Sequence, residues 1–501
     1  MGTAKRTGLV LVAALLTAAA PVPKTDPAGR ILAPRAAPGE AVRPYVRVDA
    51  PTIVLRHVRV IDGTGAPAKM DRTLVIENGR IAAIGGPELA APAGATVLDL
   101  AGRSVMPGIV GMHDHLYYIA RPGLDSDGHA HGPSPLVPQM TFSSPRMYLA
   151  AGVTTIRTAG SVEPYADLNL KGQIDAGAVP GPHMDVTAPY LEGPGSPFVQ
   201  MHLLRDAADA RRFVAFWADQ GATSFKAYMN ITRAQLRAAI DEAHRHGMKI
   251  TGHLCSVTYP EAAALGIDNL EHGFWVNTQN DPGKAPDKCP ATVGAPTLAG
   301  MDPDGPDAKD LIARLVAAKV AVTSTLPVFE PSSARYRPLS PKMLETLSPQ
   351  ARNDYLYLRT QALSAAPERK AARAALWANE LRMERAFVAA GGLLIAGPDP
   401  TGAGNVLPGF GDQRAVELLV DAGFTPLEAI RIGTLNGATY LGLADRIGSI
   451  AVGKNADLVV VEGDPSTRID DIEKVEIVFK DGVGFDSGSL LAAVRGRYGQ
   501  Y

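Results

Sequence analysis

The chain has 501 residues, of which 46% are hydrophobic and 20% are charged, and its formal net charge is -2. This length and hydrophobic content predict a folded protein with one large domain and a smaller one, and they exclude an intrinsically disordered chain. The near-neutral charge, together with the lack of a dense run of Lys and Arg, argues against nucleic acid as a partner.

The N-terminus has the pattern of an export signal. Lys5 and Arg6 precede the apolar stretch of residues 9–16, and small residues follow it. This stretch is too short to span a bilayer comfortably. We therefore expect a signal peptide over residues 1–20, a periplasmic or secreted protein, and no stable membrane insertion after cleavage. Residues 21–48, rich in Pro and Ala, are expected to form a mobile lead-in.

Two β-rich segments near opposite ends of the chain predict one small sheet domain. Residues 52–104 alternate β-prone runs with turns, and Asn78-Gly79 between alternating flanks is a strong hairpin signal. Residues 448–482 contain a second set of β-prone runs. We predict a composite β-sandwich domain formed by residues 49–104 and 447–490.

Between these segments, helical patterns alternate with short strands. The run from the N-cap Thr232 to the stop at Gly247 has apolar spacing of about 3.6 residues, and a strand follows at once over residues 249–253. Such alternation predicts an α/β fold, a parallel (β/α)₈ TIM-like barrel over residues 105–446, with its active site at the C-terminal ends of the strands. Residues 277–336, rich in Pro, Gly and Asp, are expected to form a long loop over the mouth.

The first strand of the expected barrel ends in a His-x-His pair. In extended backbone His113 and His115 project to the same side and can bind one metal ion, while Asp114 faces the other way. Further histidine and carboxylate groups, which are ligands that a hydrolytic zinc site needs, stand at the ends of later β-prone runs. We expect these strand-end residues to converge at the barrel mouth: Lys226, His253, His272 and Asp399.

The two cysteines and the remaining histidines carry less specific signals. Cys255 and Cys289 can form one bridge in an oxidising compartment, but we favour a small buried thiol for Cys255. Loops could bring four further histidines to the pocket, but a surface position is expected for each: His129, His131, His183 and His202.

The ordered motifs resemble the metal-dependent amidohydrolase superfamily, and within it the exported imidazolonepropionase-like and prolidase-like branch. The resemblance extends over residues 52–480. It rests on Met106-Pro-Gly-Ile109, His113-Asp-His115, Ala151-Gly-Val-Thr-Thr155, Phe225-Lys-Ala-Tyr228, Gly252-His253, Glu271-His272-Gly273, Gly397-Pro-Asp399, Thr425-Pro-Leu-Glu-Ala-Ile430, Thr434-Leu-Asn-Gly-Ala438 and the run from Gly448 to Leu458. The chain departs from the pattern at Arg157-Thr158, where relatives commonly have Arg-Asp, and at Pro398-Asp399, where they have Thr-Asp.

This resemblance implies a site with two zinc ions per chain. One ion would be held by His113 and His115, and the other by His253 and His272. Lys226, carboxylated on its amine, would bridge the two ions, because a carbamate offers anionic oxygens that an ammonium lacks. The alternative for this lysine is a substrate-facing cation.

Two catalytic roles follow from the same resemblance. Asp399 would bind the first ion and shuttle a proton. Tyr228 lies two residues after Lys226, so it is expected either to hydrogen-bond the developing oxyanion or to be a buried core tyrosine.

The implied activity is hydrolysis of an amide or peptide bond in a small-molecule substrate, such as a dipeptide or an N-acyl amino acid. A lactone, an ester or a cyclic amide on the same site is the alternative. A deaminase fits less well, because such members generally use one metal and lack the lysine that Lys226 matches. A non-catalytic exported binding protein is the hypothesis from a different class, and assembly into a homo-oligomer is left open.

Overall fold

The structure is a computed structural model that describes residues 27–120, 137–196, 198, 200–333, 339–402 and 405–499. The expected signal peptide over residues 1–20 lies outside the described residues, as do His129 and His131. Within the described part of the chain, no helix is both long and apolar enough to cross a bilayer.

The strands fall into one mixed sheet and two parallel sheets. The mixed sheet contains β1 (Val46–Val48), β2 (Thr52–Val60), β3 (Lys69–Glu77), β4 (Arg80–Gly85), β5 (Thr96–Asp99), β6 (Arg103–Pro107), β15 (Leu458–Glu462), β16 (Val475–Lys480) and β17 (Val483–Asp486). The parallel strands are β7 (Ile109–Gly111), β8 (Val153–Arg157), β9 (His183–Asp185), β10 (Ser224–Ala227), β11 (Lys249–Gly252), β12 (Asn269–Glu271), β13 (Ala321–Ser324) and β14 (Leu394–Ala396).

Helices follow most of the parallel strands, and others pack at the two chain ends. They are α1 (Pro27–Ile31), α2 (Ser143–Ala150), α3 (Pro164–Asp175), α4 (Ala207–Asp219), α5 (Arg233–Arg245), α6 (Tyr259–Leu265), α7 (Ala295–Gly300), α8 (Pro306–Ala317), α9 (Leu326–Phe329), α10 (Pro341–Leu344), α11 (Pro349–Leu363), α12 (Pro367–Ala389), α13 (Phe410–Asp421), α14 (Pro426–Arg431), α15 (Gly437–Leu441) and α16 (Ser487–Ala493). Short 3-10 segments are η1 (Arg43–Tyr45), η2 (Glu330–Ser333) and η5 (Ile469–Glu473), and η4 (Ile432–Asn436) is a π-helical turn.

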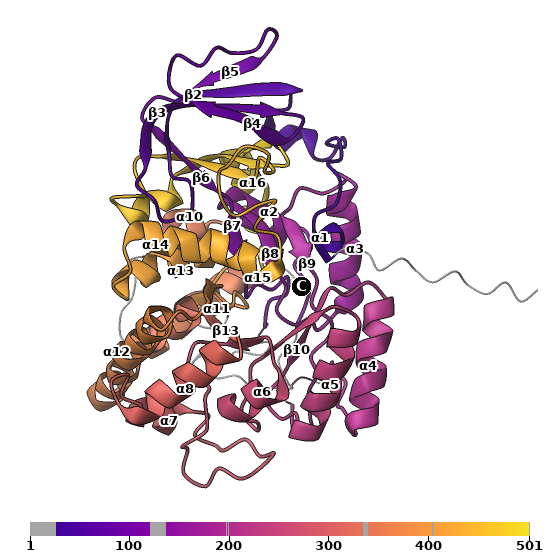
Figure 1. The fold of residues 1–501 in the computed structure, drawn as a ribbon, viewed down its shortest axis with the longest axis vertical. Coiled ribbons are helices and arrows are strands. Elements are labelled where there is room, and N and C mark those ends of the chain that lie inside the picture. Colours follow the sequence, from indigo (N-terminus) through magenta and orange to yellow (C-terminus); the bar gives the residue numbers. More distant parts are fainter. Residues whose placement is uncertain are drawn as a thin grey trace, which may run out of the picture.

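Strands from the two ends of the chain share the nine-stranded mixed sheet, in the order β1-β17-β16-β15-β6-β2-β3-β4, with β5 paired to β2. Figure 1 shows the indigo N-terminal strands and the yellow C-terminal segment together at one end of the molecule. A separate buried apolar cluster, which includes Ile53, Leu74, Val460 and Phe479, forms the core of this sheet. That the sheet is arranged as a sandwich stays a prediction.

The parallel strands follow one another in sequence order, β7-β8-β9 and β10-β11-β12-β13-β14. Backbone hydrogen bonds connect the two sheets at both junctions: Ala188 N donates to Ser224 O at 2.9 Å, and Met112 N donates to Ala396 O at 2.9 Å. Most of these strands are buried along their whole length, as parallel strands covered by helices on their outer face must be. The arrangement is TIM-barrel-like, and it gathers the C-terminal strand ends at one mouth.

Local signals in the sequence explain several elements. Asn78 and Gly79 adopt φ of 48° and 80° between β3 and β4, which confirms the predicted hairpin, since both central residues of such a turn need positive φ. The Thr232 side chain accepts a hydrogen bond from Gln235 N in a capping box that begins α5, as predicted. The buried face of α5, including Leu236 and Ile240, packs into the main apolar core.

Two expectations about irregular segments differ from the structure. Residues 27–48 of the expected lead-in contain α1, whose Ile31 and the following Leu32 are each only 4% exposed, and β1, which pairs with β17. The prediction of one long loop over residues 277–336 is wrong, because α7, α8, β13 and α9 lie there. Its Gly and Pro residues stand at helix starts, as Gly305 and Pro306 do at the N-terminus of α8.

Cys255 and Cys289 form a disulfide, with their Cα atoms 4.9 Å apart. The interpretation of Cys255 as an unpaired buried thiol is therefore wrong. The pairing could not be read from the sequence, because the 34-residue separation does not reveal that the segments after β11 and β12 meet. The bond ties the segment that follows His253 to its neighbour, where Thr278 Oγ1 also donates to Cys255 O at 2.7 Å.

Candidate metal centre

Every strand-end residue singled out in the sequence lines one cavity of about 170 Å³ at the mouth of the parallel strands. His113 and His115 follow β7, Lys226 lies in β10, and the other three follow β11, β12 and β14 respectively: His253, His272 and Asp399. The fold thus brings six side chains from five strands together, although up to 286 residues separate them in sequence (from His113 to Asp399).

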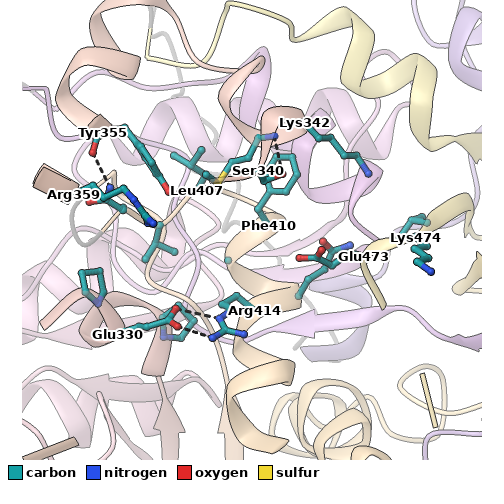
Figure 2. Close-up of a pocket in the computed structure, with 18 of the residues that line it drawn as sticks. Glu330, Ser340, Lys342, Tyr355, Arg359, Leu407, Phe410, Arg414, Glu473 and Lys474 are labelled. Carbon is teal, nitrogen blue, oxygen red and sulfur yellow. Dashed lines mark hydrogen bonds and ion pairs between the residues drawn. The ribbon is translucent and has the colours of Figure 1, made fainter. Parts of the chain in front are cut away.

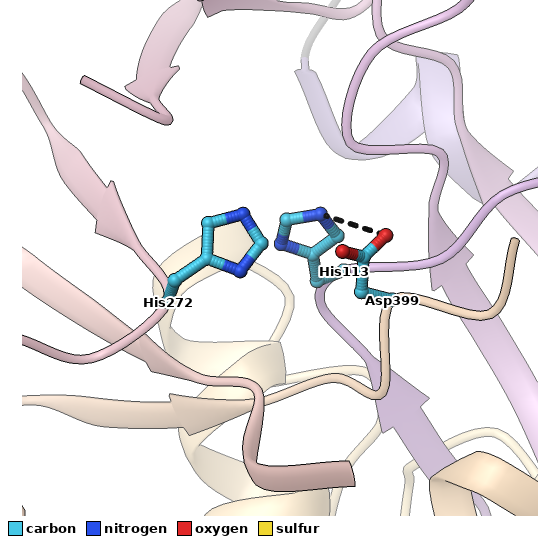
Figure 3. A group of neighbouring side chains, drawn as sticks. All are labelled: His113, His272 and Asp399. Carbon is cyan, nitrogen blue, oxygen red and sulfur yellow. Dashed lines mark ion pairs between the residues drawn. The ribbon is translucent and has the colours of Figure 1, made fainter. Parts of the chain in front are cut away.

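One side of the cavity gathers a carboxylate, two imidazoles and an amine. Asp399 Oδ1 lies 3.1 Å from His115 Nε2 and 3.6 Å from His113 Nε2, and Lys226 Nζ lies 3.0 Å from His113 Nε2. Figure 3 shows His113 between His272 and Asp399, and one ligand atom from each of these three residues lies within 4.8 Å of the others. Ligand atoms around one tetrahedral zinc ion stand about 3.3 to 3.6 Å apart, so this spacing suits a metal ion.

The other side of the cavity is formed by His253, His272 and Tyr228. The ring centroids of His253 and His272 are 4.3 Å apart, and those of His253 and Tyr228 are 5.0 Å apart. His272 Nδ1 lies 2.8 Å from Thr325 Oγ1, whereas its Nε2 is buried and has no hydrogen-bond partner among the described residues. A buried imidazole nitrogen left without a partner is costly unless something binds it, which fits a metal ligand.

Burial keeps these imidazoles neutral, which is the form that ligates a metal. Burial lowers the pKa of His115 to about 4 and that of His253 to about 3. Burial also lowers the pKa of Lys226 to about 8, against the opposing charges of Glu271 and Asp399, so a free amine is accessible near neutral pH. Burial alone raises the pKa of Asp399, but His113 and His115 hold it well below its usual range, so it is a carboxylate.

A buried ion network behind the ligands orients His113. Glu271 Oε2 lies 2.7 Å from His113 Nδ1, and Arg157 donates from Nη2 to Glu271 Oε1 at 2.7 Å and from Nε to Met112 O at 2.7 Å. Thr251 Oγ1 also donates to Glu271 Oε1. Although burial raises the pKa of Glu271, Arg157 and His113 hold it well below its ordinary value, so this residue is an anion at neutral pH.

Sequence reasoning assigned no role to Glu271 or Arg157. Glu271 ends a short buried strand directly before His272, so the alternation of side chains places it on the opposite face from His272, toward the back of His113. An isolated carboxylate in a fully buried strand is the signal that could have found it, since such a charge is nearly always paired.

The backbone is strained at two of the candidate ligands. His272 and Asp399 adopt φ of 67° and 59°, a region that residues other than glycine rarely occupy and that clusters at functional sites. Gly397 makes the approach of β14 to β7 possible, because a Cβ there would lie 2.2 Å from His113 N. These features fix where the Asp399 carboxylate meets the histidines.

Aromatic and apolar side chains complete the cavity. Tyr117 and Tyr190 share a hydrogen bond between their hydroxyls at 2.7 Å, and the Tyr190 and Tyr228 rings are 4.8 Å apart. Tyr228 therefore lines the same cavity as Lys226, although no hydrogen bond among the described residues fixes its hydroxyl. The other lining residues are Thr401 and four apolar side chains: Ile119, Val162, Phe198 and Met201.

A second cavity of about 470 Å³ lies elsewhere, between α13 and the segment before β16. Figure 2 shows Arg414 bonded to Glu330, and Phe410 and Leu407 also line this cavity. None of the six candidate ligands lines it. Of the predicted surface histidines, His202 is about half exposed beside Asp209, whereas His183 is buried and the prediction for it is wrong.

Comparisons with known proteins identify similar sequences and structures. The model of the amidohydrolase family matches residues 104–484. Enamidase from Eubacterium barkeri is 36% identical over 112 residues, which are 22% of this chain and 25% of that protein, so the matched stretch spans only a quarter of this relative.

Two solved structures share the fold over almost their whole length. The bottromycin amidohydrolase structure superposes with a TM-score of 0.65 at 21% identity, covering 93% of this chain and 96% of that chain. An Xaa-Pro dipeptidase with bound methionine in its active site superposes with a TM-score of 0.63 at 19% identity, covering 87% of this chain and 100% of that chain.

Proposed function

The chain belongs to the amidohydrolase family, and we propose that it is an exported, metal-dependent hydrolase that cleaves a carbon–nitrogen amide bond in a small molecule. One observation carries this proposal: six side chains from five strand ends, four of them buried and two partly buried, converge on a single cavity. All six are of types that can ligate a metal once Lys226 is carboxylated. The proposal takes the parallel strands as one (β/α)₈ barrel and the mixed sheet as its accessory β domain.

The residues present fit two zinc ions. His113, His115 and Asp399 would hold one ion, His253 and His272 the other, and a carbamate on Lys226 would lie between them. Bound divalent ions would lower the pKa of a water molecule and would polarise the scissile carbonyl. Three features support this assignment: His272 Nε2 has no partner among the described residues, the imidazoles are neutral, and the free amine of Lys226 is accessible.

Asp399 is positioned to move the proton. Its carboxylate is ionised and lies within 3.1 Å of His115 Nε2, so it can accept a proton from the attacking water and return it to the leaving nitrogen. Tyr228 keeps its proton because burial raises the pKa of its hydroxyl, and so it can donate a hydrogen bond to the oxygen of the attacked carbonyl.

The wall of the cavity favours an apolar group beside the scissile bond. Besides the candidate ligands, the lining of the cavity includes Ile119, Val162, Phe198 and Met201 together with aromatic rings. An N-acyl amino acid or a dipeptide with an apolar side chain would bury that surface on binding. Each Å² of apolar surface removed from water stabilises the complex by about 25 cal/mol. The similar proteins include an enamidase and, among the structures of like fold, a dipeptidase. Both names denote action on carbon–nitrogen bonds, which supports an amide or peptide as the substrate.

Replacing Met201 by Glu is expected to reverse this preference. A carboxylate in the apolar wall loses burial energy and adds a desolvation cost, so kcat/KM for a substrate with an apolar side chain should fall by about 10- to 100-fold. A matched substrate with a basic side chain should lose much less. The exposed Met70, 59% accessible, gives the control variant M70E, which should behave as wild type. Equal losses on both substrates in M201E would contradict an apolar specificity wall.

The reaction class is tested with matched substrates. Amide, ester and lactone compounds built on the same apolar acyl group are incubated with zinc-loaded protein and with protein treated with a chelator. The proposal predicts that the amide is hydrolysed and that the chelator abolishes turnover. Faster turnover of the ester or lactone by orders of magnitude would favour the alternative bond on the same site. Tight ligand binding with no turnover of any compound would make the chain a binding protein.

A further inference from the structure

We propose that His183, Asp457 and Asp481 form an additional divalent metal site, suited to Zn²⁺, where the mixed sheet meets the parallel strands. This site is separate from the cavity described above, whose lining includes none of the three residues. Its role is to tie the two parts of the fold together.

The three residues come from three different segments. His183 is the first residue of β9 in the parallel sheet, Asp457 immediately precedes β15, and Asp481 lies in the turn between β16 and β17. Their side chains are 1%, 2% and 13% exposed. A histidine predicted at the surface is thus enclosed with two carboxylates at the junction between the sheets.

The spacing of the ligand atoms matches one metal ion. His183 Nε2 lies 3.2 Å from Asp481 Oδ2 and 3.7 Å from Asp457 Oδ2, and one ligand atom from each residue lies within 4.8 Å of the others. With bonds of about 2.0 to 2.2 Å, two ligand atoms of a tetrahedral zinc ion stand about 3.3 to 3.6 Å apart.

The two carboxylates are held so that one oxygen of each remains for a ligand. Asp457 Oδ1 accepts a hydrogen bond from Asp481 N at 2.7 Å, and Asp481 Oδ1 accepts one from Asn455 Nδ2 at 3.2 Å. The Oδ2 atoms of both residues are the ones that face His183 Nε2. Such anchoring of the second oxygen is how proteins orient carboxylate ligands.

A second observation points independently to a ligand. Both ring nitrogens of His183 and Asp457 Oδ2 are buried and have no hydrogen-bond partner among the described residues. In a simple imidazolium–carboxylate pair, the imidazole N–H would point at one carboxylate oxygen. Here His183 Nε2 lies 3.2 Å from Asp481 Oδ2, but the two atoms are not aligned for a hydrogen bond. An ion between the three groups would bind two of these atoms, His183 Nε2 and Asp457 Oδ2.

The surroundings allow a fourth ligand. A cavity of about 40 Å³ touches His183 and Asp481, which is room for a water molecule. Lys480 lines the same cavity, and its Nζ lies 3.6 Å from Asp481 Oδ2, so a bound cation must share that carboxylate with an ammonium. An imidazole in the ligand set selects Zn²⁺ over Mg²⁺ or Ca²⁺ under this competition.

The test compares zinc content among variants of the whole protein. Wild type, His183→Gln and the control His244→Gln are loaded with Zn²⁺, freed of excess ion and analysed for zinc per chain. His244 is an exposed histidine, 3.0 Å from Asp268. We expect His183→Gln to hold one zinc fewer than both others, with unchanged amide hydrolysis. Because only the difference counts, this result does not depend on how many ions the catalytic cavity holds.

Two further measurements keep the proposal falsifiable if His183→Gln folds poorly. Asp457→Asn keeps the acceptor for Asp481 N but loses the anionic ligand, so it should also hold one zinc fewer. A zinc-loaded wild-type crystal should give an anomalous peak at the zinc edge between the three side chains. Equal zinc in wild type and folded variants, or no such peak, would overturn the metal site in favour of an imidazolium ion pair.

Discussion

Replacing Lys226 by Ala is expected to lower the rate of amide hydrolysis by about a thousandfold or more. The variant removes the side chain that would bridge the two ions, and metal activation is worth several kcal/mol of barrier. The metal content of the catalytic cavity should fall with it. Elemental analysis and the initial rate at saturating substrate measure the two effects.

A spectroscopic readout separates the carbamate from a merely structural lysine. Zinc-loaded wild type prepared with ¹³C-bicarbonate should show a carbamate carbon signal that Lys226→Ala lacks. Lys309→Ala, which changes an exposed lysine on α8, should retain both the signal and the rate. Full activity of Lys226→Ala would contradict the bridge, and a fully active enzyme without the carbon signal would make Lys226 a substrate-facing cation instead.

The change Glu271→Gln should weaken both the fold and the metal site. It leaves the Arg157 guanidinium, 1% exposed, without its anionic partner, and removing one member of a buried ion pair costs about 3 to 5 kcal/mol in the free energy of unfolding. It also replaces the acceptor of His113 Nδ1, so the proton can move to Nε2, the nitrogen needed by the metal. We expect about 10- to 100-fold weaker zinc binding.

A surface pair provides the matched control. Glu476 bonds Arg103 at 3.2 Å, with side chains 26% and 40% exposed, and Glu476→Gln should change stability by no more than about 1 kcal/mol. Urea unfolding of the metal-free proteins and zinc titration of the folded ones measure both effects. If Glu271→Gln unfolds at the same urea concentration as Glu476→Gln and binds zinc equally well, the network behind His113 has no such role.

The sequence predicts the side chains that face the cavity because strand alternation and motif spacing depend only on residues that are near one another in the chain. His113 and His115 share a face by the period of extended backbone, and Lys226 and Tyr228 line the same cavity for the same reason. The Asn78-Gly79 hairpin and the Thr232 cap are equally local, since the residues themselves determine the turn and the helix start.

The rest depends on contacts between distant segments. The Glu271–Arg157 pair joins β12 to β8, and the Cys255–Cys289 bond joins the segments after β11 and β12. The spacing of these residues along the sequence predicts neither contact. His183 is buried because β9 begins beside the turn before β17, so its partners come from the far end of the chain. Pro and Gly occur in loops and also at helix starts, so the sequence does not distinguish a helix that begins at Pro306 from a loop.

The measurement that tests the account most directly follows hydrolysis of an amide with an apolar acyl group as Zn²⁺ is titrated into metal-free protein in the presence of bicarbonate. The account predicts no turnover at the start, a rate that rises with zinc and then saturates, and a free carboxylate and amine as products. Hydrolysis at full rate in the metal-free protein, or no amide hydrolysis at any zinc content, would contradict it.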